Sequence, residues 1–219
     1  MSFTLVIIVV IIAIDSKKEC INMSITNRIL LENSTGISEH DLTAASAYNG
    51  VITITNTITS QMSVNFALLL RHLAEEGKDI KILIDSNGGE VNAGLVIYDL
   101  IQAYPYNVDM YCIGTAASMA AILLAGGREG HRFILPHAKV MIHEPLIANG
   151  FGGSATTIEQ KARNILEIKS MLNEILAKHT GKKIKEIDKA TALDNFMSAE
   201  EAVKFGICDK ISNIYDMED

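Results

Sequence analysis

The stretch from Gly114 to Gly127 constrains the fold of this chain more than any other. The residues before it, 108–113, alternate polar and apolar side chains, which predicts a strand. After Ser118 come good helix formers in apolar company, and two glycines at 126 and 127 end them. A strand, a tight turn and a buried helix are therefore expected, with one hydroxyl at the turn. Small neighbours and a helix N-terminus suit a nucleophile there, although a serine that caps a helix is the common alternative.

Composition narrows the class of protein. The chain has 219 residues, of which 48% are hydrophobic, so it can bury a large core. Its formal net charge is −7 and it shows no cluster of Lys and Arg, which argues against a nucleic-acid partner. The 3 cysteines are widely spaced without a CxxC motif, so neither a zinc site nor a disulfide framework is expected. A reducing, cytoplasmic location fits this pattern.

The N-terminus carries an apolar run over residues 3–14. It is too short for a membrane-spanning helix, which needs roughly 20 residues, and it lacks the basic region and cleavage site of a signal peptide. Three interpretations stay open: an extension or translation-start artefact with Met23 as the working start, a packed strand or helix, and a membrane anchor. The predicted organisation is a hydrophobic extension over 1–22, an N-terminal arm over 23–50 and a single domain over 51–219.

Patterns in the first half of that domain predict an α/β fold. A strand over 51–55 and an amphipathic helix over 63–76 come first, and the helix is expected to bury Val64, Ala67, Leu68 and Leu73. The apolar run 80–84 is typical of a strand in a parallel sheet. It leads through Gly88 and Gly89 into a helix over 91–103, which makes a βαβ unit with the strand at 107–113. The glycine pair is either a turn with positive φ or a backbone N–H presented to a substrate oxygen.

The second half contains two short expected strands, 131–135 and 139–143, and His143 ends the second. The longest expected helix runs from Ser154 to Thr180, about 40 Å at 1.5 Å per residue. That is longer than one small domain needs, so the helix is expected to project or to contact a second subunit. A helix over 184–191, a loop over 193–197, a capped helix from Ser198 and a strand over 207–212 follow. The acidic tail is expected to fray.

Three side chains could form a catalytic triad: Ser118 as the nucleophile, His143 as its base and Asp194 as the residue that orients the base. Their order in the chain differs from that of the chymotrypsin, subtilisin and α/β-hydrolase types. Spacing alone does not decide whether these three residues meet.

From about Val51 to Ile211 the chain resembles the ClpP-type serine proteases, the proteolytic subunits of ATP-dependent Clp proteases. The resemblance lies in separate blocks in the right order. They are Ile84–Gly89 with Ala93-Gly94, Gly114–Ala121, Arg132–Pro136, Val140–Pro145 and Asp194–Val203.

This resemblance implies a βαβ superhelix of the ClpP/crotonase-like fold with a projecting handle at about 146–180. It assigns Ser118, His143 and Asp194 to the triad, and the N–H groups of Gly89 and Met119 to an oxyanion hole. It also implies heptameric rings stacked into a tetradecamer, which encloses a chamber for unfolded polypeptide. A Clp-type AAA+ unfoldase would feed that chamber and use the ATP, so this subunit itself is expected to need neither a cofactor nor a metal.

Several positions depart from the family pattern. Asn87 replaces a usual proline, and Glu144 replaces the glutamine that usually follows the catalytic histidine. Lys81 and Leu83 stand where aromatic residues usually receive the ATPase. The arm before residue 50 does not match the axial loop of the family. These departures affect the expected partner contacts more than the expected chemistry.

Three other interpretations compete with this one. A Ser–Lys dyad peptidase of the SppA type would use Lys139 as its base, but the block around Asp194 argues against it. A non-catalytic ring component would not need a complete triad. A crotonase-like acyl-CoA enzyme shares the architecture and a backbone oxyanion hole, but it needs no nucleophilic serine, so fluorophosphonate labelling of Ser118 would separate the two.

Overall fold

The computed structural model describes residues 6–7, 12–13, 22–23, 28–33, 36–147 and 152–212. The chain divides into two compact units, Met1–Ile52 and Thr53–Asp219, and each is described by itself. The expected acidic tail and the glycine-rich residues 149–151 lie outside the described residues.

The first unit contains an antiparallel hairpin of β4 (Arg28–Asn33) and β5 (Gly36–Asp41), and β1 (Val6–Ile7) pairs with β4. β2 (Ile12–Ala13) pairs with β3 (Asn22–Met23). The Asp41 carboxylate caps α1 (Leu42–Tyr48) by accepting from the N–H groups of Thr43 and Ala44. Most of the apolar run 3–14 lies outside the described residues. Among the helices that the structure describes, none has the length and apolar character to cross a membrane.

The second unit is built on one mixed sheet. Its main path runs β11 (Asn195–Met197), β10 (Lys139–Ile142), β8 (Val108–Ala117), β7 (Ile80–Ser86) and β6 (Val51–Thr55). β9 (Arg132–Ile134) also pairs with β8, and β12 (Lys210–Ile211) pairs with β9. β7, β8 and β10 are parallel neighbours, so their carboxyl ends meet at one edge. In parallel α/β sheets that edge is where ligands bind.

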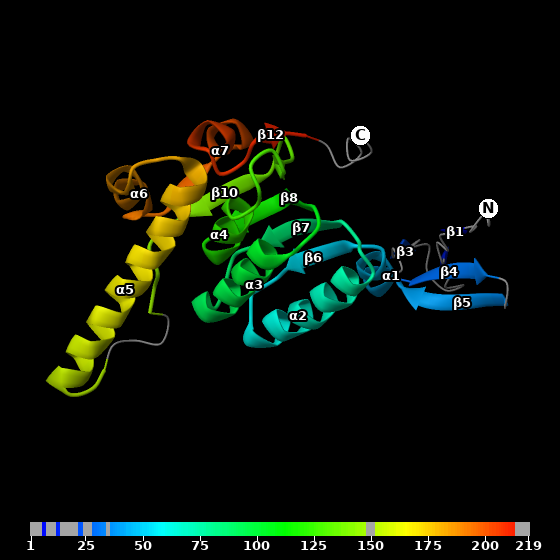
Figure 1. Cartoon of the computed structure of the whole chain (residues 1–219), viewed down its shortest axis with the longest axis horizontal. Helices are drawn as coiled ribbons and strands as arrows, with labels where there is room; N and C mark the ends of the chain where they lie inside the picture. Colours follow the sequence, from blue (N-terminus) through cyan, green and yellow to red (C-terminus); the bar gives the residue numbers. More distant parts are fainter. Residues whose placement is uncertain are drawn as a thin grey trace. The chain divides into compact units, whose positions relative to one another are not determined.

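Helices cover this sheet. α2 (Ser60–Glu75) and α3 (Val91–Ala103) lie side by side along β6 and β7 (Figure 1). α4 (Met119–Ala125) is buried at every residue, while α6 (Ile184–Thr191) and α7 (Ala199–Phe205) lie towards β10 and β12 (Figure 1). The parallel β7–α3–β8 unit confirms the predicted βαβ motif, and the mixed α/β architecture agrees with the fold that the resemblance implies.

The long helix α5 (Ala155–Thr180) extends well beyond the sheet (Figure 1). The Ser154 hydroxyl accepts from the N–H of Thr157 at its start, and Gly181 ends it in the left-handed conformation, φ 69°. Of the residues of α5, all of which the structure describes, only Leu172, Asn173 and Leu176 are buried. The helix bounds therefore confirm the sequence prediction, and its first four turns lie open in the isolated subunit.

Two local predictions were wrong. α2 buries Ser63, Phe66, Leu70 and Leu73, whereas Val64 is 54% and Leu68 is 65% exposed. Both stripes have helical spacing, and periodicity does not tell which one faces the core. The segment expected to be a loop at 193–197 contains the strand β11, because residues 195–197 pair antiparallel with β10.

Candidate active site

Ser118 lies at a sharp turn between β8 and α4. Its backbone has φ 54° and ψ −123°, a conformation that residues other than glycine rarely adopt. Its N–H donates to the carbonyl oxygen of Met141 at 2.8 Å, and its own carbonyl accepts from Ala121 at 3.0 Å. The hydroxyl makes no capping hydrogen bond to α4. The capping interpretation of this serine is therefore wrong, and its side chain is presented at the carboxyl edge of the sheet.

His143 follows directly after β10, and its Nε2 lies 2.8 Å from the Oγ of Ser118. Parallel pairing of Met141 with Ala117 aligns the ends of β10 and β8, so the residues that follow each strand emerge close together. The imidazole is largely buried, with 12% of its side chain exposed. A neutral imidazole at this distance can accept the proton of a serine hydroxyl.

Asp194 reaches the other side of this imidazole. Its Oδ1 lies 3.4 Å from the Nδ1 of His143, and 63% of its side chain is exposed. The strand register explains this contact. Ile142, the last residue of β10, pairs with Asn195, the first residue of β11, so His143 directly after β10 lies opposite Asp194 directly before β11. The structure thus brings the three residues together in the order Ser118, His143, Asp194.

The glycine pair lies beside the serine turn. Ile58 accepts from the N–H of Glu90 at 2.9 Å and donates to the carbonyl of Gly88 at 2.8 Å. Backbone N–H groups alternate in direction along an extended chain, so the N–H of Gly89 points away from Ile58. Gly89 and Met119 both line the pocket beside Ser118, and the N–H of Met119 is among those that start a helix without an intrahelical partner.

Gly88 shows why this position lacks a side chain. Its φ is +91°, and an added Cβ would lie 2.7 Å from the carbonyl oxygen of Ala117 and 2.9 Å from the nitrogen of Met119. The loop therefore touches the turn that carries Ser118. This close approach gives the glycine a steric reason besides its backbone conformation.

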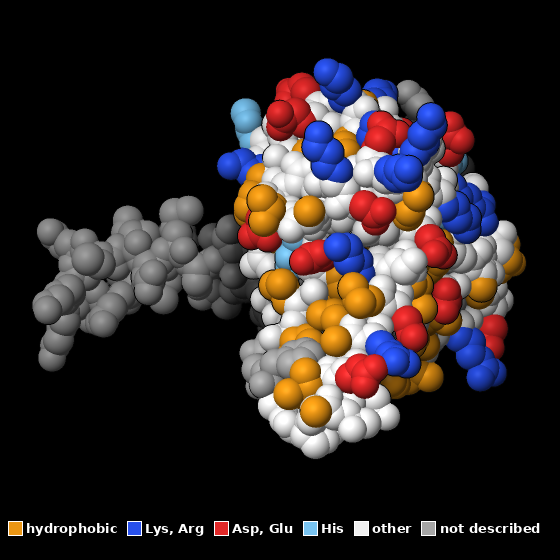
Figure 2. Space-filling view, turned by 90° about the vertical axis from the view of Figure 1, so that its left-hand side faces the viewer, with side chains coloured by type: hydrophobic (Ala, Val, Ile, Leu, Met, Phe, Trp, Pro, Cys, Tyr) orange, Lys and Arg blue, Asp and Glu red, His pale blue; other side chains and the backbone are white. Residues whose placement is uncertain are grey.

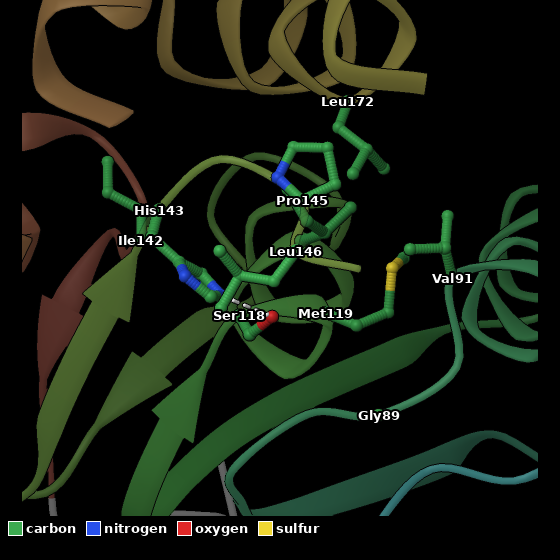
Figure 3. A pocket seen from close by; sticks show the side chains of 10 residues that line it. Gly89, Val91, Ser118, Met119, Ile142, His143, Pro145, Leu146 and Leu172 are labelled. Carbon is green, nitrogen blue, oxygen red and sulfur yellow. Dashed lines mark hydrogen bonds between the residues drawn. The ribbon is translucent and has the colours of Figure 1, made fainter. Parts of the chain in front are cut away.

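A pocket of about 200 Å³ opens beside the serine and histidine. In Figure 3 the Met119 and Val91 side chains lie on one side of Ser118, while Pro145, Leu146 and Leu172 lie above it. Leu172 comes from α5, so the long helix contributes a wall. The remaining walls are Gly89, Ile122 and Ile142, and every lining side chain is apolar apart from those of Ser118 and His143.

Other candidate nucleophiles, bases and metal sites lie elsewhere or are unsuited. Lys139 is exposed at the start of β10, opposite Thr115. Burial raises the pKa of the Cys112 thiol to about 12 and also raises that of Cys208, so both are protonated at neutral pH. Within the part of the chain that the structure describes, no group of three His, Cys, Asp or Glu side chains could hold a metal ion.

Sequence reasoning missed the residues that support this constellation. The contact of Ile58 with the glycine loop spans about thirty positions in the chain, and Lys169 of α5 forms an ion pair with Glu144 at 2.6 Å. No short-range pattern predicts either contact. The sequence Pro145-Leu146 after His143 was the one available signal for an apolar wall.

Comparison with known families agrees with this geometry. The family model described as Clp protease matches residues 34–214, which is most of the chain and includes every residue of the site described above.

Proposed function

Because this chain belongs to the Clp protease family and is thereby a ClpP-type serine peptidase, we propose that Ser118, His143 and Asp194 are its catalytic residues. The observation that carries the proposal is the contact of Ser118 Oγ with His143 Nε2 at 2.8 Å. The Ser118 hydroxyl is available for this contact because it makes no capping hydrogen bond to α4. Asp194 on the far side of the imidazole would hold the tautomer that accepts the serine proton.

In the proposed reaction Ser118 attacks the carbonyl carbon of a peptide bond while His143 takes the hydroxyl proton. The N–H groups of Gly89 and Met119 stabilise the oxyanion, because both border the pocket at the serine. His143 then gives its proton to the leaving amine, and water releases the acyl group by the same steps in reverse order. The apolar lining of the pocket favours an apolar side chain next to the cleaved bond.

We propose that this subunit acts in the cytoplasm as part of a ring-shaped protease. Heptameric rings would stack through α5 into a tetradecamer whose chamber admits unfolded polypeptide. A Clp-type AAA+ unfoldase would supply folded substrates at the expense of ATP. The exposed apolar side chains on α5 support an assembly through this helix, among them Ile158, Leu166 and Met171. Figure 2 views the molecule from the side on which α5 lies in Figure 1, and it shows apolar side chains gathered there between charged ones.

Cleavage of a short fluorogenic peptide with an apolar residue before the scissile bond tests the chemistry. Ser118→Ala and His143→Ala should each lower kcat by about 10³-fold or more, with the double variant hardly worse than either. A fluorophosphonate probe should label wild-type Ser118 and leave Ser118→Ala unlabelled. Full activity in His143→Ala would refute the proposed base, and an unlabelled wild-type serine would favour a crotonase-like enzyme.

The partner is tested separately. The isolated particle should cleave short peptides but leave a folded, tagged protein intact until a Clp ATPase and ATP are added. Lys81 lies on β7 where the family usually offers an aromatic side chain, and a charge there would be costly to bury. Degradation of the folded protein without any ATPase would contradict the closed chamber.

A further inference from the structure

Glu144, the residue directly after His143, is bonded to both helices that follow it. Its carboxylate accepts from the Nζ of Lys169 on α5 at 2.6 Å. Its backbone N–H donates to the carbonyl oxygen of Thr191 at the end of α6, at 2.7 Å. One residue therefore ties the histidine segment to the long helix by its side chain and to the next helix by its backbone.

The two helices are also fixed to each other at this level. Asn173 of α5 is 2% exposed, and its amide donates to Asp188 of α6 at 2.8 Å. The hydroxyl of Thr191 contacts the amide oxygen of the same Asn173 at 3.2 Å. α5 and the end of α6 thus form a bonded unit, and Glu144 is the point at which the histidine segment meets it.

Asp194 lies between this unit and β11, because it follows Thr191 by three residues and directly precedes Asn195, which pairs with Ile142 of β10. The distance from Asp194 Oδ1 to His143 Nδ1, 3.4 Å, is longer than an ordinary N–H···O hydrogen bond. Asp194 itself is mostly exposed and gains little support from packing. We therefore expect a shift of the α5–α6 unit to reach this contact from two sides, through Glu144 next to His143 and through Thr191 before Asp194.

We propose that Glu144 and Lys169 are a positioning pair, which holds the α5–α6 unit against the segment after His143 and so keeps His143 aligned between Ser118 and Asp194. The inference rests on the proposed function and deepens it, since it assigns two residues that act through the triad. The ordinary alternative is a surface ion pair without consequence. Both side chains are partly exposed, Lys169 at 30% and Glu144 at 41%, and pairs of this kind contribute little to folding stability.

The same pair could instead shape the pocket. Leu172 lies one turn after Lys169, and it lines the pocket together with Pro145 and Leu146, the two residues after Glu144. The two roles predict different kinetics. A change in pocket shape weakens binding of the apolar side chain and raises KM, whereas a misaligned base lowers kcat. The split between KM and kcat therefore separates positioning from pocket shape.

The experiment measures kcat, KM and the rate of fluorophosphonate labelling for Glu144→Ala, Lys169→Met and Glu144→Gln. Glu144→Ala and Lys169→Met should each lose about tenfold in kcat and in labelling rate, with KM nearly unchanged, because small misplacements of catalytic groups are costly. Glu144→Gln keeps an acceptor for Lys169 and should lose less. The exchanged pair, Glu144→Lys with Lys169→Glu, should recover part of the loss.

Arg163→Met is the matched control, because Arg163 forms an exposed ion pair of the same length, 2.6 Å, with Glu159 on the same helix. It should keep wild-type kinetics, and sedimentation should show the same particle for every variant. Unchanged kcat in Glu144→Ala and Lys169→Met, a change confined to KM, or an equal loss in Arg163→Met would each overturn the inference while Ser118→Ala still upholds the proposed function. A wild type without peptidase activity would overturn both.

Discussion

α4 and α5 both carry apolar side chains, but they differ in how far the subunit buries them. Every residue of α4 is buried, from Met119 to Ala125. α5 has 26 residues, and its three buried ones all belong to its last turns. Its exposed apolar side chains include Ile158 at 38%, Leu166 at 62% and Met171 at 47% exposure. The subunit therefore covers α4 on all sides, whereas it leaves most of α5 exposed.

The difference separates two tasks. Burial on all sides fixes α4, whose N-terminus presents the N–H of Met119 beside Ser118, so the proposed nucleophile and oxyanion hole are built by one subunit. The open part of α5 is suited to contact between copies of the chain. The buried end of α5 contributes to the candidate active site, since Leu172 lines the pocket and Lys169 bonds to Glu144.

The largest expected effect comes from charging the apolar stripe along α5, in which Ile158, Ala162 and Ile165 follow each other at helical spacing. Ile165→Glu should weaken association by on the order of a hundredfold, because burying an unpaired carboxylate at an interface costs at least about 3 kcal/mol. Sedimentation velocity should then show smaller particles, while circular dichroism shows an unchanged helical content.

Thr156→Glu is the matched control, because it adds the same charge to an exposed residue of α5 that shares a helix face with Arg163 and Ser170 and not with Ile165. It should leave the particle intact. If Ile165→Glu left the particle unchanged as well, the proposed assembly through α5 would be wrong and the open face would need another partner.

A smaller effect is expected where α4 meets α3. An added Cβ at Gly94 of α3 would lie 2.2 Å from the Cγ of Met119, so Gly94→Ala must displace the Met119 side chain. We expect about a tenfold loss of kcat because Met119 lines the pocket and supplies a proposed oxyanion donor. Gly152→Ala is the control, since a Cβ there meets nothing within 4 Å. Wild-type kinetics in Gly94→Ala would mean that α4 is less rigidly held than its burial indicates.

The sequence predicted what local patterns encode. The βαβ unit, the serine turn and the bounds of α5 rest on periodicity, glycines and caps within a few residues of each other, and the structure confirms them. The buried face of α2 was missed because its two apolar stripes have the same period, and only tertiary contacts select Phe66 and Leu70. The proximity of His143 and Asp194 depends on the register of β10 and β11, and three residues of strand are too few to predict it.

The smallest expected effect concerns the buried end of α5. The Nε2 of His179 lies 2.8 Å from the Oη of Tyr98 on α3, and the rings meet edge to face with centroids 5.7 Å apart. Arg132 donates to the carbonyl oxygen of the same histidine at 2.9 Å. Desolvation, followed by the charges of Lys178 and Arg132, lowers the pKa of His179 to about 4.

This pKa shift makes the stability of the packing around His179, at the C-terminal end of α5, sensitive to acid. In the unfolded chain His179 takes up a proton near its ordinary pKa of 6.5, whereas in the folded protein it does so only near 4, so acid favours the unfolded state between these values. Stability is therefore complete above about pH 6.5 and falls as the pH drops towards 4. Allowing for the partial exposure of the ring, the loss should be about 1 kcal/mol, or roughly 3 °C in Tm.

Comparing Tm at pH 7 and pH 5 isolates this contribution, because other groups titrate equally in wild type and variant. His179→Gln keeps a hydrogen-bonding partner for Tyr98 but carries no titrating ring, so its Tm should fall less than that of the wild type over this interval. His137→Gln, at an exposed position, should fall as much as the wild type. An equal fall in His179→Gln would mean that the anchored end of α5 opens to solvent as readily as its free end, and the contrast between the two ends of the helix would then fail.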